Sequence, residues 1–451
     1  MNRILSKSEY LFLHSKHTYS VRQISTLIEP KAFVNGSWVS SNSGAVFSVH
    51  DPSNGSHLID VPDMDEHDTT KAILAASRAF KSWKETTGKE RSQILRRFFN
   101  VCQEHQEELA RILTLEQGKP LPEAKGEIVY GNSYLEWFSE EARRGYGDVV
   151  PSPDKTKEFI LVREPIGVAA MITPWNFPNA MLARKAAAAL ASGCTCVVKP
   201  SPDTPLSALA FASLAQKAGV PDGVINIITT SKNLESVSKT ICENTDIKAL
   251  SFTGSTRIGK LLYNQCSSTI KKISLELGGN APFIVFDSAD VDAAVKGLMA
   301  SKFRNVGQTC VSSNRIFVQS GIYEAFINAL KENIMGSLVL GNGLADGVNQ
   351  GPLINERQVQ NVEHLVEEAL EHGAKVILGG KRASNLGQLF YEPTLMTDVL
   401  PNMRIFKEEI FGPVVSIIKF ETEEEAIHMA NDTQVGLAGY LYSNNIIAYY
   451  F

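Results

Sequence analysis

Residues 251–262, SFTGSTRIGKLL, come close to a phosphate-binding loop. Gly254, Gly259 and Lys260 match the pattern G-x-x-x-x-G-K, but Leu261 stands where a hydroxyl side chain would ligate Mg²⁺. A strand-like run precedes the loop and a helix is expected after it, so backbone N–H groups at the helix start favour an anion. The pyrophosphate of a dinucleotide fits this better than a metal-bound triphosphate does. A strand-to-helix turn without a ligand is the alternative, and a kinase or hydrolase is a distant third.

The composition is that of an ordinary globular protein. The chain has 451 residues, 43% of them hydrophobic and 21% charged, and a formal net charge of −5. Such a charge offers no basic surface to a phosphate backbone, so small molecules are the expected partners rather than nucleic acid. No apolar run in the sequence reaches the length of a membrane span, so we expect no membrane association.

The cysteines indicate a reducing compartment and no metal centre. The six are Cys102, Cys194, Cys196, Cys242, Cys266 and Cys310. They form no C-x-x-C pair, and no histidine stands beside them at a metal-ligand spacing. We therefore expect no bound metal.

Residues 1–28 have the composition of a mitochondrial transit peptide. They contain four Lys or Arg side chains and one acidic residue, with repeated serines and interspersed Leu, Ile and Phe. This predicts a mitochondrial matrix protein. A tail that carries no address, in a cytoplasmic protein, is the alternative.

The next segment is predicted to be helical scaffold. Residues 68–118 repeat apolar positions at helical spacing, with Asp68 or Thr69 as the expected N-cap and Gly118 as the stop. Over residues 145–164 the pattern changes to a strand-like alternation around the turn Pro-Ser-Pro-Asp. We expect a β-hairpin arm there that serves oligomerisation.

From residue 165 onward, short apolar runs alternate with helices, which indicates an α/β fold with a doubly wound parallel sheet. Strands are expected at GVAAMIT, CTCVVK, VINII and KALSF, with helices through MLARKAAAALASG and SALAFASLAQKAG. A second α/β region begins near Gly279, with strands at PFIVF, RIFVQ, KVILGG, PVVSIIKF and AGYLYS. Ligands of such sheets bind at the carboxyl ends of the strands. The expected domains are therefore a dinucleotide-binding domain at 29–144 and 165–278, and a catalytic domain at 279–451.

Five further motifs lie at predicted strand ends or in connecting loops. They are ITPWNFP (172–178), VVKPSP (197–202), SLELGG (274–279), GQTC (307–310) and EEIFGPV (408–414). In order and spacing, together with the opening loop, they resemble the aldehyde dehydrogenase superfamily from about residue 32 to 443. Longer strings such as SKFRNVGQTCVSSN and NQGPLINE are most similar to members that oxidise succinate semialdehyde. The resemblance implies that family's fold and oxidation of succinate semialdehyde to succinate, a step of 4-aminobutyrate breakdown.

The resemblance also assigns catalytic roles. Cys310 matches the nucleophile, which adds to the aldehyde carbonyl before hydride removal. The side chain of Asn176 and the Cys310 backbone N–H match the donors that stabilise the resulting oxyanion. Glu276 matches the base that activates water to hydrolyse the thioester. Lys185 matches a supporting residue. Without the resemblance, Cys310 would be a buried thiol, Asn176 a turn residue and Glu276 a strand-end carboxylate.

Eight residues match the cofactor-binding positions of the family. They are Trp175, Lys199, Gly254, Ser255, Gly259, Leu277, Glu409 and Phe411. Pro202 departs from the pattern, because NAD-preferring members often place there a Glu that accepts from ribose hydroxyls. Proline neither accepts such a bond nor repels a 2′-phosphate. NAD is the first expectation and NADP the alternative.

Two arginines match the residues that bind the distal carboxylate of a semialdehyde. Arg184 and Arg304 would present planar, permanently charged groups to it. An arginine on a helix is more often a solvated surface charge. Ser312 replaces a second cysteine that some relatives use for a regulatory disulfide, so no such switch is expected.

The chain ends before the family's C-terminal segment, which includes part of the pocket wall and a strand of the assembly arm. We therefore expect a fragment or shortened product, although the resemblance implies a homotetramer. An inactive dinucleotide-binding fold is the alternative to an active dehydrogenase. Another small aldehyde as substrate is the second alternative.

Overall fold

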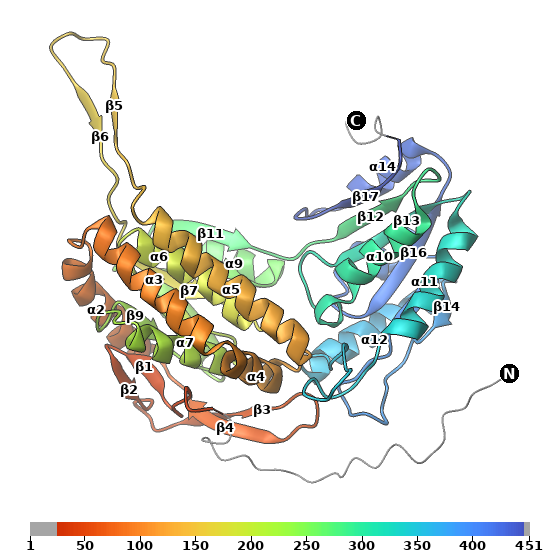
Figure 1. The fold of residues 1–451 in the computed structure, drawn as a ribbon, viewed down its shortest axis with the longest axis horizontal. Coiled ribbons are helices and arrows are strands. Elements are labelled where there is room, and N and C mark those ends of the chain that lie inside the picture. The colour runs from red at the N-terminus through yellow and green to blue at the C-terminus, as the bar shows by residue number, and fades with distance from the viewer. Residues whose placement is uncertain (1–24, 446–451) are drawn as a thin grey trace.

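The computed structural model describes residues 25–445 and contains two α/β sheets (Figure 1). The predicted transit peptide lies outside the described residues except for its last four. Two of these, Leu27 and Ile28, are buried in the hydrophobic core, and Ser25 and Thr26 hydrogen-bond to Glu108. The described residues contain no helix that is long and apolar enough to cross a bilayer.

The first sheet has seven strands in the order β11-β10-β7-β8-β9-β1-β2. The five from β11 to β9 are parallel, and β1 and β2 form an antiparallel edge. The central strands are apolar and buried on both faces, as parallel strands between helices must be. The strands are β1 (Ala32–Val34), β2 (Ser37–Val39), β7 (Val168–Ile172), β8 (Thr195–Lys199), β9 (Ile225–Ile227), β10 (Ile247–Thr253) and β11 (Lys272–Glu276).

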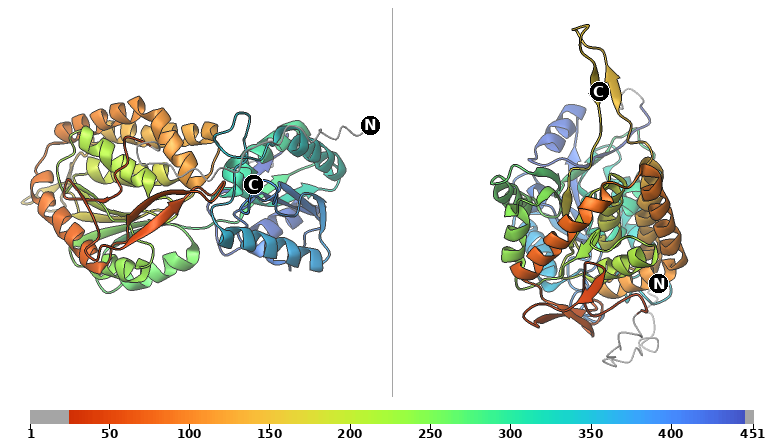
Figure 2. Two further views of the ribbon diagram at one scale, coloured as in Figure 1. Left: turned by 90° about the horizontal axis from the view of Figure 1, so that it is seen from below. Right: turned by 90° about the vertical axis from the view of Figure 1, so that its left-hand side faces the viewer.

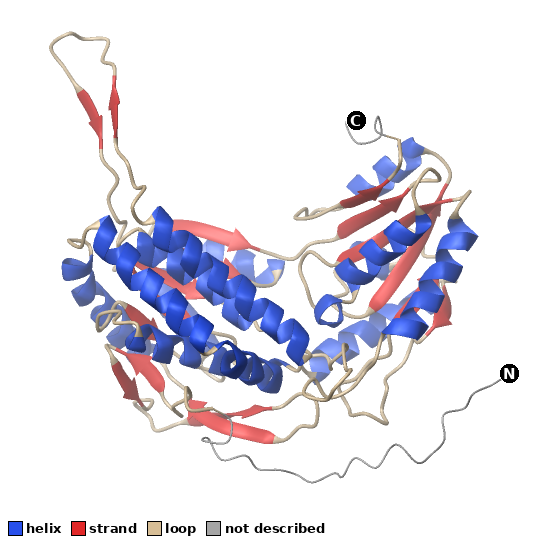
Figure 3. Cartoon of the chain, in the orientation of Figure 1, coloured by secondary structure: helices blue, strands red, loops and turns tan. Residues whose placement is uncertain are grey.

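Helices cover both faces of this sheet, which confirms the doubly wound α/β prediction (Figure 3). One face packs against α3 (Gly88–Glu104), α4 (Gln106–Gln117), α5 (Leu121–Glu141), α6 (Pro178–Ala191) and α7 (Leu206–Lys217). The other packs against α2 (Glu66–Trp83), α8 (Leu234–Glu243) and α9 (Thr256–Cys266).

The start of α2 corrects the predicted N-cap. The cap is Asp65, whose side chain accepts from the N–H groups of His67 and Asp68. Asp68 is the third residue of the helix and accepts from the Asp65 backbone N–H, which completes a capping box. Asp68 and Thr69 are therefore helical, because the earlier aspartate satisfies the free amides first.

Two antiparallel hairpins flank the first sheet. The first pairs β3 (Val46–His50) with β4 (His57–Pro62). The second pairs β5 (Asp148–Val150) with β6 (Phe159–Leu161) and falls within the predicted arm. Both strands of the second hairpin are exposed, and it projects from the body (Figures 1 and 2).

The second sheet has six strands in the order β14-β15-β16-β13-β12-β17. It is parallel except for β14. Its strands are β12 (Ala281–Val285), β13 (Ser313–Gln319), β14 (Lys375–Leu378), β15 (Thr394–Thr397), β16 (Val414–Phe420) and β17 (Tyr440–Tyr442). One face packs on α10 (Val291–Lys302) and α11 (Tyr323–Ser337), the other on α12 (Glu356–Glu371), α13 (Arg404–Lys407) and α14 (Glu423–Asn431).

The chain passes from one sheet to the other at Gly278 and Gly279, between β11 and β12. A Cβ atom on Gly279 would lie 2.6 Å from the Cys310 carbonyl oxygen, and one on Gly278 would lie 2.5 Å from Glu409 Oε2. The connection therefore needs glycine because Cys310 and Glu409, which precede β13 and β16, approach its backbone closely.

Candidate active site

A cavity of about 340 Å³ lies where the two sheets meet. Its lining contains ten of the thirteen predicted site residues: Trp175, Asn176, Arg184, Gly254, Ser255, Leu277, Arg304, Cys310, Glu409 and Phe411. The other three, Lys199, Gly259 and Glu276, are not part of the lining.

A strained turn leads to Cys310. In the 3-10 segment η1 (Arg304–Gly307), Asn305 and Val306 have φ angles of 50° and 58°, and Gly307 has 75°. A β-branched residue such as valine rarely adopts this left-handed conformation. At Gly307 a Cβ atom would lie 2.2 Å from the Gly412 carbonyl oxygen. Such strain persists only where the surroundings fix it, and it is concentrated at functional sites.

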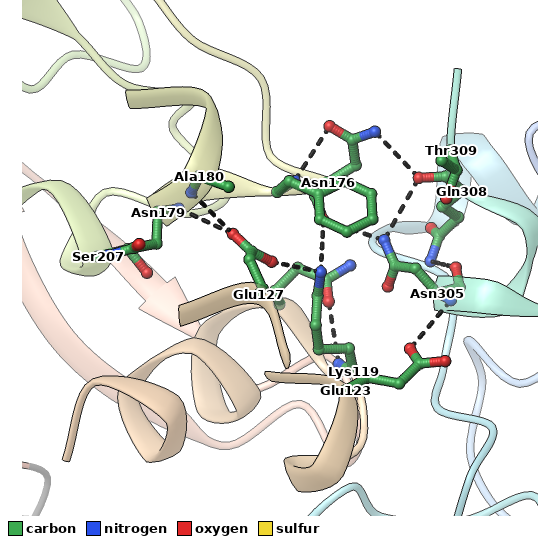
Figure 4. Close-up of polar contacts among 12 residues, drawn as sticks. Lys119, Glu123, Glu127, Asn176, Asn179, Ala180, Ser207, Asn305, Gln308 and Thr309 are labelled. Atoms are coloured by element: carbon green, nitrogen blue, oxygen red, sulfur yellow. Dashed lines mark hydrogen bonds and ion pairs between the residues drawn. The ribbon is translucent and has the colours of Figure 1, made fainter. Parts of the chain in front are cut away.

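Polar contacts fix this turn beside Asn176 (Figure 4). Asn305 Nδ2 donates to the Asn176 carbonyl oxygen at 3.0 Å, and Asn176 Nδ2 donates to the Gln308 carbonyl oxygen at 3.0 Å. Gln308 Oε1 accepts from the Ile354 N–H at 2.9 Å. A side-chain amide carries two hydrogens, so Asn176 keeps one to offer a second acceptor.

Cys310 is the one cysteine of the six that is not buried. Partial burial and the nearby carboxylates of Glu409 and Glu276 raise the pKa of its thiol, and backbone hydrogen bonds oppose this weakly. The group is therefore mainly a thiol at neutral pH. A nucleophilic role requires a base or a change in the local charge.

Glu276 ends β11 and is exposed rather than lining the cavity. Its carbonyl oxygen accepts from the Gly254 N–H at 3.0 Å, which joins it to the loop after β10. Its carboxylate is close enough to raise the pKa of the Cys310 thiol. A carboxylate on this edge therefore acts on the thiol electrostatically.

Glu409 is a half-buried carboxyl group that lines the cavity. Its Oε1 accepts from the Gly279 N–H at 3.2 Å. Burial raises its pKa to about 7, although this hydrogen bond and the nearby Lys302 favour the charged form. Phe411, two residues on, packs edge-to-face on Trp175 with ring centroids 5.4 Å apart. Both rings line the cavity.

The predicted anion site lies at the start of α9. Ser255 is the N-cap, and its Oγ accepts from the Ile258 N–H at 3.4 Å. Gly259 lies behind the cavity, since a Cβ atom there would lie 2.4 Å from Leu277 Cδ2. Its role is thus to let Leu277, which does line the cavity, pack against α9.

Two lysines lie near the sheet edge. Lys199 ends β8, and burial lowers its pKa to about 8. Lys185 on α6 donates to Ser251 Oγ at 2.9 Å, and burial lowers its pKa to about 8 despite the nearby Glu276 carboxylate. Lys185 therefore ties α6 to β10 beneath the site.

The cavity lining is cationic. It contains Arg184, Arg304 and also Arg357, which the sequence analysis did not identify, and a single carboxylate, Glu409. The Arg304 guanidinium lies 4.9 Å from the ring centroid of Phe177. A cavity with this excess of guanidinium groups favours an anionic ligand.

A buried ion pair that the sequence analysis missed supports Asn176 (Figure 4). Lys119 Nζ lies 2.6 Å from Glu127 Oε2 and 2.7 Å from the Asn176 carbonyl oxygen. Glu127 Oε1 accepts from the N–H groups of Asn179 and Ala180 at 3.0 and 3.2 Å, at the start of α6. The pair thus fixes Asn176 from behind.

A second buried glutamate, Glu116, caps α7. Glu116 accepts from the N–H groups of Leu206 and Ser207 at 2.6 and 2.8 Å, and also from the Ser207 hydroxyl. Burial raises its pKa to about 8. The sequence offered one signal for Glu116 and Glu127. Each is a glutamate on the buried, otherwise apolar face of a helix.

The chain belongs to the aldehyde dehydrogenase family, whose model matches residues 38–449. It is 51% identical to the 3-sulfolactaldehyde dehydrogenase of Pseudomonas putida, covering 93% of this chain and 86% of that protein. It is 52% identical to the mitochondrial succinate-semialdehyde dehydrogenase of Homo sapiens, covering 93% of this chain and 78% of that protein.

A solved structure shows the same fold. The crystal structure of an Escherichia coli NADP-dependent enzyme superposes with a TM-score of 0.92 at 51% identity, covering 94% of this chain and 87% of that one. The chain is also 51% identical to the NADP(+) succinate-semialdehyde dehydrogenase GabD of Escherichia coli (strain K12), covering 94% and 87%. The family and fold predictions are thereby confirmed.

Proposed function

We propose that this protein oxidises succinate semialdehyde to succinate with a nicotinamide dinucleotide. One observation carries the proposal: the cavity that holds the Cys310 thiol is lined by three arginines and a single carboxylate. A neutral aldehyde has no group that would use these cations. An aldehyde whose far end is an anion gains charge-assisted hydrogen bonds from Arg184 and Arg304.

We propose the following roles for the reacting groups. After the Cys310 thiol releases its proton to solvent, the thiolate adds to the aldehyde carbon and forms a thiohemiacetal. Its oxyanion accepts from the second Asn176 Nδ2 hydrogen and the Cys310 N–H. Loss of a hydride leaves a thioester. Glu276 removes a proton from water, which attacks the thioester carbon and releases the acid and the Cys310 thiolate.

The residues around the cavity fit a dinucleotide. The helix start at Ser255 offers free N–H groups to a pyrophosphate, and Lys199 at the end of β8 offers a cation to the adenosine ribose. Trp175, Leu277 and Glu409 would hold the nicotinamide half. When bound, the nicotinamide ring supplies the hydride acceptor. We propose NAD first, with NADP accepted because Pro202 carries no carboxylate.

Two relatives favour other substrates as second candidates. One relative carries the name 3-sulfolactaldehyde dehydrogenase and another glutarate-semialdehyde dehydrogenase, each about half identical to this chain. Both names describe aldehydes with a distal anion, which the same arginines would bind.

Domain roles, assembly and location complete the proposal. We propose that 29–144 with 165–278 bind the dinucleotide and that 279–451 carry the nucleophile. The exposed apolar strands β5 and β6 support a role for the hairpin in a homo-oligomer. The composition of residues 1–28 supports mitochondrial import.

A substrate panel tests the specificity. Rates of dinucleotide reduction are compared for succinate semialdehyde, glutarate semialdehyde, 3-sulfolactaldehyde and butanal. Arg304→Gln should lower kcat/KM for the three anionic aldehydes by roughly 10-fold or more while changing that for butanal little. Arg78→Gln, an exposed arginine on α2 that does not line the cavity, is the control. Equal rates for butanal and the anionic aldehydes in the native enzyme would refute the proposal.

A further inference from the structure

Two tyrosines on α5 form a hydrogen-bond chain with Arg184. Tyr134 Oη accepts from the Arg184 guanidinium at 2.8 Å, and the Arg184 guanidinium lies 5.0 Å from the Tyr134 ring centroid. Tyr130, one helical turn earlier, has its ring centroid 5.1 Å from that of Tyr134. Its hydroxyl oxygen lies 2.6 Å from Tyr134 Oη. Tyr130, Arg184 and Arg304 all line the cavity.

The two hydrogen bonds run in one direction, from Arg184 through Tyr134 to Tyr130. A guanidinium can only donate, so Tyr134 Oη is the acceptor in its bond with Arg184. The single Tyr134 hydroxyl hydrogen is then given to Tyr130 Oη. Tyr130 keeps its own hydroxyl hydrogen, which no group within residues 25–445 accepts. The side chain is partly exposed and lines the cavity, so this hydrogen is available to a ligand.

The direction of this hydrogen-bond chain favours an anionic group as the acceptor for the Tyr130 hydroxyl. Each hydrogen bond polarises the next, so the Arg184 charge strengthens Tyr130 as a donor. The Tyr134 contact also restricts the long Arg184 side chain, whose ordering would otherwise cost free energy on binding.

We propose that Tyr130 is a substrate-binding residue that donates a hydrogen bond to the distal anionic group of the aldehyde, with Tyr134 as the positioning residue for both Tyr130 and Arg184. This inference rests on the proposed function, because it assumes that the substrate has a distal anion. It adds an uncharged, directional donor to the two guanidinium groups. A flexible carboxylate would thereby be fixed with its aldehyde end toward Cys310.

The test compares succinate semialdehyde with butanal, a neutral aldehyde with the same number of carbons. Tyr130→Phe removes one hydroxyl and keeps the ring. It should lower kcat/KM for succinate semialdehyde by roughly 10- to 100-fold, as expected for a lost hydrogen bond to a charged group, and change kcat/KM for butanal by less than about 3-fold.

Tyr134→Phe separates positioning from direct contact. It keeps the ring stacked on Arg184 but interrupts the hydrogen-bond chain, so KM for succinate semialdehyde should rise while kcat changes little. Tyr263→Phe is the matched control, since Tyr263 is an exposed tyrosine on α9 that does not line the cavity. Thermal unfolding of all three variants checks that the fold is kept.

The outcomes distinguish this inference from the proposed function. If the native enzyme does not prefer succinate semialdehyde to butanal, the proposed function fails, and this inference fails with it. If the native preference exists and Tyr130→Phe retains it, only this inference is overturned. A selective loss in Tyr130→Phe that is absent in Tyr263→Phe supports the inference.

Discussion

The buried ion pair between Lys119 and Glu127 provides the sharpest prediction about how the site is held. The exposed fractions of the two side chains are 1% and 0%, and Nζ lies 2.6 Å from Oε2. Burial lowers the pKa of Lys119, and the partner carboxylate opposes this. Removing one member of such a pair leaves an uncompensated buried charge, which costs about 3–5 kcal/mol.

Lys119→Met removes the cation and keeps much of the side-chain volume. The Glu127 carboxylate then remains buried with two backbone N–H partners, and the Asn176 carbonyl oxygen loses its 2.7 Å contact. We expect the start of α6 to be destabilised by about 3 kcal/mol or more, which corresponds to a loss of amide protection of more than about 100-fold. We also expect kcat to fall, because Asn176 is no longer fixed beside the turn to Cys310.

Hydrogen exchange measured by mass spectrometry on peptides covering residues 176–184 gives the local stability at the start of α6. It does not require that both sheets unfold together. The double variant Lys119→Met/Glu127→Gln removes both charges and keeps an oxygen for the α6 amides. It should recover at least half of the lost protection. A loss below about 1 kcal/mol in Lys119→Met, or no recovery in the double variant, would contradict the reasoning.

Three further predictions concern charge. Burial and two carboxylates raise the pKa of the Cys310 thiol. The rate of its alkylation by iodoacetamide should therefore rise with pH, with a midpoint above the ordinary thiol pKa of about 8.5. A midpoint below pH 7 would refute this. Pro202→Glu should lower kcat/KM for NADP by at least about 10-fold, because a carboxylate would repel the 2′-phosphate, and should leave kcat/KM for NAD nearly unchanged. Equal effects on both dinucleotides would show that position 202 lies away from the ribose. Burial raises the pKa of Glu116 to about 8, so the folded protein holds a proton there that the unfolded chain releases near pH 4.5. The stability of the native protein relative to Glu116→Gln should therefore fall as the pH rises from about 4.5 to 8. A difference in urea-unfolding free energy that stays constant over this pH range would contradict this.

Local pattern was sufficient for much of the fold. The central strands β7, β8 and β10 are short apolar runs that are buried on both faces, and such runs are recognisable without tertiary information. Helix α5 was missed because its sequence contains two glycines and buried polar residues such as Glu127 and Asn132, which disturb the apolar period. The antiparallel edge strands β1 and β2 are only three residues long and give little periodic signal.

Part of the candidate site could also be predicted from sequence motifs, and part of it could not. The sequence motifs predicted that Asn176, Leu277, Cys310 and Glu409 contribute to one site, and all four line the cavity. Asn176 and Leu277 follow β7 and β11 at the carboxyl edge of the first sheet, whereas Cys310 and Glu409 precede β13 and β16 of the second. The supporting contacts could not be predicted, since Lys119 reaches Asn176 across 57 residues of sequence. The pKa of Cys310 depends on carboxylates from separate segments, which the sequence does not place.

The proposed reaction requires that Cys310 add covalently to the aldehyde and that a nicotinamide dinucleotide accept the hydride. The most direct measurement is absorbance at 340 nm with succinate semialdehyde and either NAD or NADP, for the native protein and for Cys310→Ala. We expect reduction of the dinucleotide by the native protein and its loss in the variant, with dinucleotide binding retained. No reduction by a folded native protein that binds the dinucleotide, or equal reduction by Cys310→Ala, would contradict it.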